Sequence, residues 1–267
     1  MTIGFKTSYK HLPKFSRFVE RHFKCIDISK TVVPVDYIFS APNYNNCLVD
    51  NKLCEEAMTN KVITPSTGTN HIIADLAEIT SIKNDHILRE ITSTAEHNLF
   101  LILSLVRNIE PVRQLSDLQL GVLGYGRLGQ MIEERTEHLY KAVKCKDLDF
   151  EDPGFFEDTD ILTVNIDLRP DNIELINKEY LSKFKKPIFI VNTSRGEVVN
   201  ENDIINGLWD RTILGYGTDV IQEEHTTKTT ILKVEKHKNL IITPHTGGIA
   251  VDAQEKAYRR VIEKLKL

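Results

Sequence analysis

Short apolar runs alternate with helical patterns along almost the whole of this 267-residue chain. The runs span residues 36–41, 61–65, 120–124, 142–146, 160–166, 187–193, 213–220 and 239–245. Most are apolar throughout instead of at every second position, which is typical of parallel strands covered by helices on both faces. The pattern therefore predicts an α/β fold built from doubly wound parallel sheets.

The clearest helix is predicted over STAEHNLFLILSLVRNIEP, residues 93–111. Ser93 and Glu96 fit a capping box, and apolar residues follow at helical spacing until Pro111. This helix separates two regions of strand–helix alternation. We therefore expect two domains with a cleft between them, one over 1–92 completed by a C-terminal helix at 249–267, and one over 93–248.

Composition narrows the classes of function. The formal net charge of -4 provides no general basic surface for nucleic acid. No apolar run approaches the roughly 18 residues of a membrane span, and the N-terminal stretch has no apolar segment of the kind that directs secretion. The four cysteines form no CxxC pair, so no metal site is expected and a reducing cytoplasm is favoured.

A glycine-rich loop carries the first candidate chemistry. Gly124, Gly126 and Gly129 follow an apolar run in the order GxGxxG and open a helical stretch, with Arg127 and Leu128 between the last two. The first glycine permits a tight turn, the second lets a pyrophosphate approach the backbone, and the third lets the helix pack closely on the strand. Free N–H groups at the helix start would then face the phosphates. The pattern predicts a Rossmann-type dinucleotide-binding domain.

The next apolar run ends on Asp147. An acidic side chain there accepts hydrogen bonds from both hydroxyls of the adenosine ribose and repels a 2′-phosphate. We therefore expect NAD in preference to NADP. A glycine turn without a ligand, followed by a solvated aspartate, is the alternative interpretation.

Further stretches appear in chain order with the glycine loop: TPSTGTNHI (64–72), the 93–111 helix, NTSRGEVVNENDII (192–205), GTDVIQEEH (217–225) and TPHTGG (243–248). Together they resemble the D-isomer-specific 2-hydroxyacid dehydrogenases, which include phosphoglycerate dehydrogenase. The resemblance covers roughly residues 60–255. It implies a smaller, flavodoxin-like substrate domain beside the NAD domain.

The resemblance also implies roles for individual residues. The expected catalytic residues are Arg195, which binds the substrate's carboxylate and carbonyl, His245 as acid/base, and Glu224, which orients and charges the histidine. The expected cofactor-binding residues are Gly124, Gly126, Arg127, Leu128, Gly129, Asp147, Thr193, Asp219 beside the nicotinamide, and Gly248. The expected substrate-binding residues are Ser66, Thr67, Gly68 and Asn70, together with Arg195.

The chemistry of these residue types agrees with those roles. Arginine offers a planar fork for a carboxylate, and histidine exchanges protons near neutral pH. Several bland alternatives stay open at this point. They are Arg195 as a solvated loop residue, Glu223 instead of Glu224 as the histidine's partner, His245 as a plain strand-end residue, Asp219 as a turn cap, and Asn70 and His71 as turn-formers.

The chain departs from the family pattern in several places. The linker NIEPVRQLSDLQL replaces an aromatic-containing arm, and the short stretch after Asp147 suggests that one peripheral strand is lost or shortened. His225 stands where the family commonly has proline, and Asn165-Ile166-Asp167 replaces His-x-Pro. These changes leave the three catalytic positions intact and put an arm-mediated dimer and the adenine wall in doubt.

The sequence thus predicts an NAD-dependent oxidoreductase that interconverts a small D-2-hydroxy acid and its 2-oxo acid. We expect the protein to form a homodimer. A non-enzymatic relative that senses NAD(H) or binds a partner is the main alternative. A dehydrogenase of formate-like substrates is a third interpretation, but that branch is expected to carry glutamine where this chain has Glu224.

Overall fold

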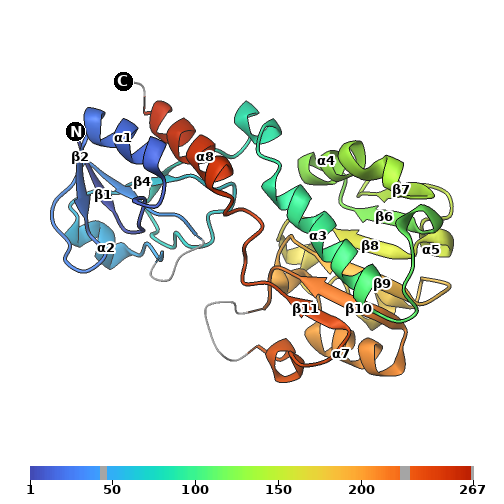
Figure 1. The fold of residues 1–267 in the computed structure, drawn as a ribbon. Coiled ribbons are helices and arrows are strands. Elements are labelled where there is room, and N and C mark those ends of the chain that lie inside the picture. The colour runs from blue at the N-terminus through green and yellow to red at the C-terminus, as the bar shows by residue number, and fades with distance from the viewer. Residues whose placement is uncertain (43–46, 223–228, 266–267) are drawn as a thin grey trace. The chain divides into compact units, whose positions relative to one another are not determined.

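The computed structural model describes residues 1–42, 47–222 and 229–265. It separates into two compact units (Figure 1). The first unit comprises residues 1–92 and 248–267, and the second comprises residues 93–247. Each unit encloses its own parallel sheet and its own apolar core.

The first unit contains a five-stranded sheet. Its strands are β1 (Thr2–Phe5), β2 (Lys24–Asp27), β3 (Tyr37–Phe39), β4 (Lys61–Thr64) and β5 (Glu78–Ser81). Its helices are α1 (Pro13–His22), α2 (Asn51–Glu56), the short 3-10 helix η1 (His86–Arg89) and the C-terminal α8 (Val251–Glu263). The strand order is β2-β1-β3-β4-β5 and every pair is parallel. This is the flavodoxin-like order that the resemblance implies.

Helices α1 and α8 pack side by side on one face of this sheet (Figure 1). Their shared core contains Phe15 of α1 and Tyr258 of α8, whose rings meet edge to face with centroids 5.3 Å apart. The other face packs against α2 around Ile38 and Val62. The C-terminal helix therefore belongs to the unit that begins the chain, although the intervening unit separates the two in sequence.

The second unit contains a six-stranded sheet. Its strands are β6 (Gln119–Leu123), β7 (Ala142–Lys146), β8 (Ile161–Val164), β9 (Ile188–Asn192), β10 (Ile213–Thr218) and β11 (Leu240–Ile242). Its α-helices are α3 (Ser93–Asn108), α4 (Arg127–Thr136), α5 (Phe155–Asp158), α6 (Lys178–Leu181) and α7 (Glu201–Asp210). Its 3-10 helices are η2 (Leu115–Asp117), η3 (Glu137–Leu139), η4 (Pro170–Asn172), η5 (Gly196–Val198) and η6 (Ile231–Val234).

The strands of the second sheet lie in the order β11-β10-β9-β8-β6-β7, again all parallel. Successive residues of β9 point to opposite faces: Ile190 packs in the core on the α7 side, and Phe189 in the core on the α3 and α4 side. A strand buried on both faces must be apolar throughout, which explains the continuous apolar runs.

The expected fold class is confirmed, and each of the eight apolar runs contains a strand. Three strands of the first unit, β1, β2 and β5, were not among those runs. In the sheet of the second unit, β7 is an edge strand, and the chain leaves it through a short connection to α5. Ser93, expected to start a capping box, is itself the first residue of α3, and its hydroxyl donates to the carbonyl of Gly247.

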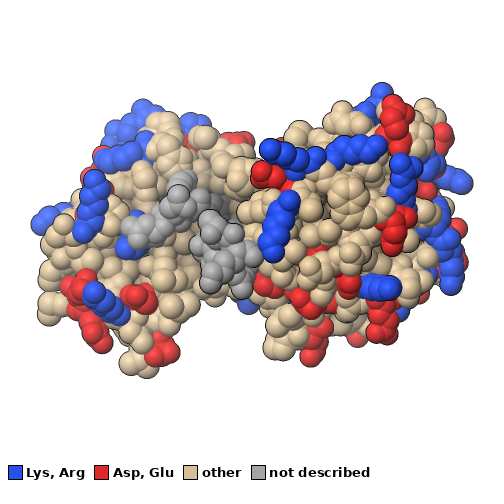
Figure 2. Space-filling model, turned by 90° about the horizontal axis from the view of Figure 1, so that it is seen from below, with Lys and Arg blue, Asp and Glu red and all other residues tan. Residues whose placement is uncertain are grey.

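Among the described residues, no helix is both long and apolar enough to cross a membrane. Lysine and arginine side chains are mixed with aspartate and glutamate on the face drawn in Figure 2. None of the four cysteines forms a disulfide.

Candidate functional site

The candidate site residues of the second unit follow the carboxyl ends of its strands. Because all six strands are parallel, these ends lie along one edge of the sheet, where α/β folds bind their ligands. The glycine loop follows β6, Arg195 follows β9, Asp219 follows β10, and His245 follows β11. The chain leaves β6 for β7 on one side of it and then continues to β8 on the other, so the glycine loop lies where the strand order reverses.

The glycine loop has three distinct local geometries. Gly124 adopts φ +89°, a conformation that side chains disfavour, and a Cβ there would lie 2.8 Å from the backbone of Asn165. A Cβ at Gly129 would lie 2.1 Å from the carbonyl oxygen of Gly124, so α4 can approach β6 only with glycine at this position. A Cβ at Gly126, in contrast, would meet no atom within 4 Å.

These geometries fit a pyrophosphate group. Gly126 precedes the ten-residue helix α4, whose first-turn N–H groups have no intrahelical partner. The open space at Gly126 lies at this helix start, where an anion benefits from the helix dipole. Arg127 and Leu128 occupy the first turn of the same helix. Nearby, the side-chain oxygen of Asn165 is buried and lacks a hydrogen-bond donor among the described residues.

Asp147 immediately follows β7 and binds the glycine loop directly. Its Oδ2 accepts the backbone N–H of Tyr125 at 2.7 Å, and its Oδ1 accepts the N–H of Leu148 at 2.7 Å. The side chain is half-buried. The carboxylate is thus held beside the loop, with acceptor capacity remaining on both oxygens for ribose hydroxyls.

Arg195 lies between β9 and η5 and is half-buried. Asn192 donates from its side-chain amide to the carbonyl of Arg195 at 2.9 Å, and the guanidinium of Arg195 donates to the carbonyl of Ser194 at 2.6 Å. The adjacent Gly196 touches the backbone of Ile221, just past β10. Local backbone contacts therefore fix where the arginine leaves the sheet edge.

Asp219 organises the segment that contains His245. Its Oδ1 accepts the hydroxyl of Thr243 at 2.5 Å and the N–H of Thr246 at 2.8 Å, and its Oδ2 accepts the N–H of Gly247 at 2.7 Å. Burial alone would raise the pKa of Asp219, but these bonds and one from His97 outweigh it and hold the pKa below its usual range. Asp219 thus caps the 243–247 turn, as the alternative interpretation of this residue expects.

His245 lies at the centre of that turn. It adopts φ +53°, a left-handed conformation that is uncommon for a residue with a side chain, and its N–H donates to the carbonyl of Thr243 at 3.0 Å. The side chain is half-buried. Residues held in such conformations gather at functional sites when the surrounding structure fixes them.

Thr193 is buried under α3 instead of being open at the sheet edge, with 7% of its surface exposed. Its hydroxyl accepts the side-chain amide of Asn98 at 3.0 Å, and the same amide donates to Thr163 of β8 at 2.8 Å. Sequence reasoning missed Asn98, which joins α3 to two neighbouring strands. Gly248, expected beside the cofactor, begins the C-terminal segment of the first unit.

The substrate-loop candidates all lie in the first unit, directly after β4. Ser66 accepts the N–H of Gly68 at 3.1 Å, and the N–H of Ile72 donates to the carbonyl of Thr69 at 2.8 Å. Asn70 and His71 are therefore the central residues of a β-turn, as the bland alternative holds. Asn70 and Thr67 are exposed, whereas His71 is buried and contacts the hydroxyl of Thr64.

Glu224 and its competitor Glu223 lie outside the described residues, and so does His225. Within the described part of the chain, no group of three or more His, Cys, Asp or Glu side chains is arranged to hold a metal ion.

Comparison with known proteins agrees with this geometry. The family described as D-isomer specific 2-hydroxyacid dehydrogenase, NAD binding domain, matches residues 86–247. The chain is 31% identical to a glycerate dehydrogenase of Methylorubrum extorquens over 162 residues, which is 58% of this chain and 51% of that protein. It is 26% identical to a D-specific alpha-keto acid dehydrogenase of Enterococcus faecium, covering 76% of this chain and 72% of that protein. A formate dehydrogenase of Candida boidinii is also 26% identical, over 86% of this chain and 74% of that protein.

Solved structures show the same fold. A D-lactate dehydrogenase from Aquifex aeolicus, solved with NAD and lactic acid, superposes with a TM-score of 0.78 at 21% identity. That similarity covers 100% of this chain and 94% of the other. A D-2-hydroxyisocaproate dehydrogenase superposes with a TM-score of 0.81 at 14% identity, covering 99% of this chain and 95% of the other.

The chain belongs to the D-isomer specific 2-hydroxyacid dehydrogenase family. The expected family, its two parallel-sheet units and its NAD-binding domain are confirmed. Its relatives are NAD-dependent dehydrogenases, so the expected enzyme class is confirmed at the level of the family. The chain spans about half the length of the glycerate dehydrogenase that it matches.

Proposed function

We propose that this protein catalyses the NAD-dependent interconversion of a D-2-hydroxy acid and its 2-oxo acid. The observation that carries the proposal is the shared sheet edge: Arg195 and His245 follow β9 and β11 at the same edge as the glycine loop. A cation that can bind a carboxylate and a side chain that can exchange a proton are the two groups that this reaction requires.

NADH, when bound, supplies the hydride that reduces the carbonyl carbon of the 2-oxo acid. Arg195 holds the substrate carboxylate through its planar fork, which fixes the orientation of the neighbouring carbonyl. His245 in its protonated form gives a proton to the carbonyl oxygen, so that a hydroxyl group forms in place of an alkoxide, the carboxylate keeps its charge, and the ring becomes neutral. In the oxidation of the hydroxy acid, the neutral imidazole of His245 takes that proton back.

Glu224 is proposed as the partner of His245, with Glu223 as the competing residue. A carboxylate beside one ring nitrogen fixes the tautomer and favours the charged imidazolium. This part of the proposal rests on the family pattern. The substrate contacts of Ser66, Thr67, Gly68 and Asn70, and the cofactor contacts of Thr193, Asp219 and Gly248, likewise stay predictions.

A panel of 2-oxo acids with NADH, followed at 340 nm, tests the proposal, and formate with NAD belongs in the same panel. Formate oxidation releases carbon dioxide without a proton transfer from a hydroxyl, so it has no need for an acid/base histidine. Turnover of 2-oxo acids supports the proposed reaction. Turnover of formate alone would favour the formate-like alternative, and NADH binding without any turnover would favour the non-enzymatic one.

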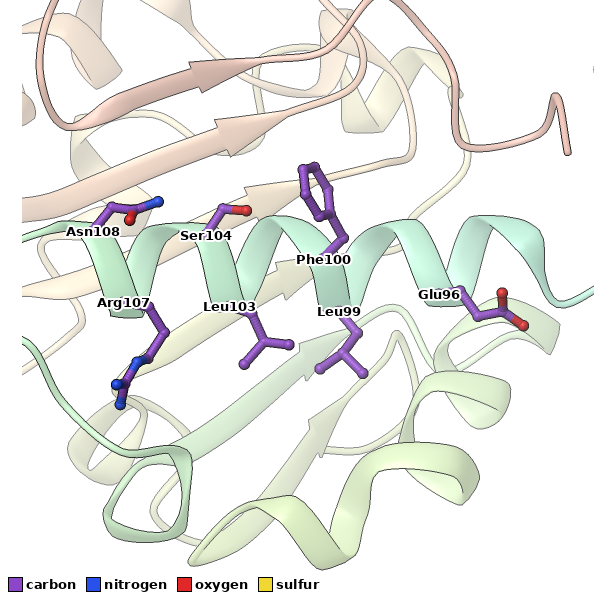
Figure 3. Close-up of a pocket in the computed structure, with 7 residues that line it drawn as sticks. All are labelled: Glu96, Leu99, Phe100, Leu103, Ser104, Arg107 and Asn108. Carbon is purple, nitrogen blue, oxygen red and sulfur yellow. The ribbon is translucent and has the colours of Figure 1, made fainter.

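We further propose that the protein forms a homodimer through the outer face of α3. This face forms a groove lined by Glu96, Leu99, Phe100, Leu103, Ser104, Arg107 and Asn108 (Figure 3). Phe100 is 50% exposed and Leu103 is 40% exposed, so an apolar stripe faces outward between polar ends. Sedimentation of Leu103→Glu against wild type tests the proposal: a dimer in wild type that the variant loses supports it, and a wild-type monomer contradicts it.

A cytoplasmic location is also proposed. It is supported by the four cysteines, none of which forms a disulfide, as is usual in a reducing compartment.

A further inference from the structure

The first two turns of α3 face the ends of four neighbouring strands. Ser93 and His97 are four residues apart and lie on one face of the helix, and Asn98 is the residue after His97. Asn98 binds Thr163 of β8 and Thr193 after β9. Ser93 and His97 bind the segments that follow β10 and β11. The start of α3 thus holds the loops at the carboxyl edge of the sheet.

His97 makes the contact closest to the candidate catalytic turn. Its Nε2 lies 2.9 Å from the hydroxyl oxygen of Thr243 and 3.2 Å from Oδ1 of Asp219. Both partner oxygens act as acceptors here, because Thr243 uses its own hydrogen to donate to Asp219. The Nε2 atom must therefore carry a hydrogen. The His97 side chain is 16% exposed and that of Asp219 only 3%, so water competes little for this contact.

The other side of Asp219 holds the turn around His245. Asp219 accepts the N–H groups of Thr246 and Gly247, while Ser93 donates to the carbonyl of Gly247 at 2.6 Å. His245 stands between these anchor points in its left-handed conformation. A turn that must keep a side-chain-bearing residue at positive φ needs such external support.

We propose that His97 is a positioning residue for catalysis: through Thr243 and Asp219 it holds the 243–247 turn so that His245 keeps its orientation. His97 contacts neither His245 nor the reacting atoms in this account, and it acts only through that pair. The proposal rests on the proposed function for its catalytic consequence, whereas the structural link to His245 can be measured without turnover.

Two variants separate the hydrogen bond from mere space-filling. Glutamine at this position keeps an N–H donor on a side chain of similar reach, whereas leucine fills the space without a donor. We expect His97→Leu to lower kcat for 2-oxo acid reduction by about 10- to 100-fold, since a displacement on the order of 1 Å at the reacting group can cost about 100-fold. KM and NADH affinity should change less than about threefold, because Arg195 and the glycine loop are untouched. A lowered kcat with a nearly constant KM is typical of losing an interaction that is made only in the transition state.

His97→Gln should restore most of kcat, and His138→Leu, on the exposed η3, serves as a matched control. The second readout is the ring signal of His245 in ¹⁵N-histidine-labelled protein, assigned by its loss in His245→Ala. It should shift or broaden in His97→Leu and stay near the wild-type position in His97→Gln.

An unchanged kcat together with an unchanged His245 signal in His97→Leu would overturn the proposal. So would equal impairment of His97→Gln and His97→Leu. If wild type reduces no 2-oxo acid, the proposed function fails, and the His245 signal alone then decides whether His97 positions the turn.

Discussion

Gly196 and Ile221 are in direct backbone contact: a Cβ added to Gly196 would lie 2.0 Å from the carbonyl carbon of Ile221. No real Cβ atom tolerates such a separation, and a backbone neighbour cannot rotate away as a flexible side chain can. Close packing of the backbone therefore requires glycine after Arg195, whether or not a ligand is bound. The contact also fixes Arg195 beside the segment that follows β10.

Gly196→Ala should consequently destabilise the second unit and displace Arg195. We expect a loss of about 1–3 kcal/mol in the free energy of unfolding, the usual cost of forcing an extra methyl group into a filled site. Denaturant unfolding measures this loss, and kinetics on the best substrate should show a raised KM. Stability and KM both equal to wild type would show that the backbone relaxes without consequence.

Two alanine variants in the glycine loop after β6 should differ in their effects: one should lower stability, and the other should weaken cofactor binding. Gly129→Ala meets the carbonyl of Gly124 and should destabilise the fold, whereas Gly126→Ala meets no protein atom and should leave the melting temperature within about one degree. Gly126→Ala should nevertheless weaken NADH binding at least about tenfold, because its methyl group enters the space expected for the pyrophosphate. Calorimetric titration and thermal unfolding of both variants test this. Wild-type NADH affinity in Gly126→Ala would remove the loop from the cofactor site.

Asp147 should set the preference between cofactors. Wild type is expected to bind NADH more tightly than NADPH, because a carboxylate at this position repels a 2′-phosphate. Asp147→Asn keeps an acceptor for the N–H of Tyr125 but loses the charge, so the difference between its affinities for NADH and NADPH should become smaller. Asp149→Asn, at an exposed position two residues away, is the control. Equal affinity of wild type for both cofactors would contradict the assignment.

Arg195→Lys should raise KM for the 2-oxo acid strongly while NADH affinity stays nearly constant. Lysine keeps the positive charge but loses the bidentate fork for a carboxylate. Arg211→Lys, exposed beyond the end of α7, should behave as wild type in the same assay. Steady-state kinetics of the two variants decide the matter, and an unchanged KM in Arg195→Lys would exclude a carboxylate-binding role.

The missed strands show what an apolar pattern can and cannot predict. The central strands of the second sheet, such as β9, are buried along their whole length and stand out as apolar runs. The strands β2 and β5 lie at the two edges of the first sheet and are largely half-exposed or exposed, so polar residues such as Lys24 and Glu78 interrupt them. The strand β1 is buried, but Gly4 separates its two apolar residues, Ile3 and Phe5. Strands that are half-exposed or interrupted in this way form no continuous apolar run.

The site was predictable only where a residue type and a strand end coincide. Arg195, Asp219 and His245 could be placed at one sheet edge because parallel strands share a direction. His97 could not be found that way, since a single histidine within a helical pattern gives no indication of its partners. Its contacts with Thr243 and Asp219 depend on how α3 packs across β9, β10 and β11, which emerges only in three dimensions.

Comparing the pH dependence of wild type with that of His245→Ala shows whether His245 exchanges the proton. If His245 exchanges the proton, wild-type reduction should slow and oxidation should become faster as the pH rises, because the two directions need opposite protonation states of this residue. His245→Ala should lower kcat by about 100- to 10,000-fold and lose that opposition, with NADH binding preserved. The measurement is kcat for the best 2-oxo acid from pH 6 to 9 in both proteins. A variant that reduces this substrate at the wild-type rate across that range would contradict the account.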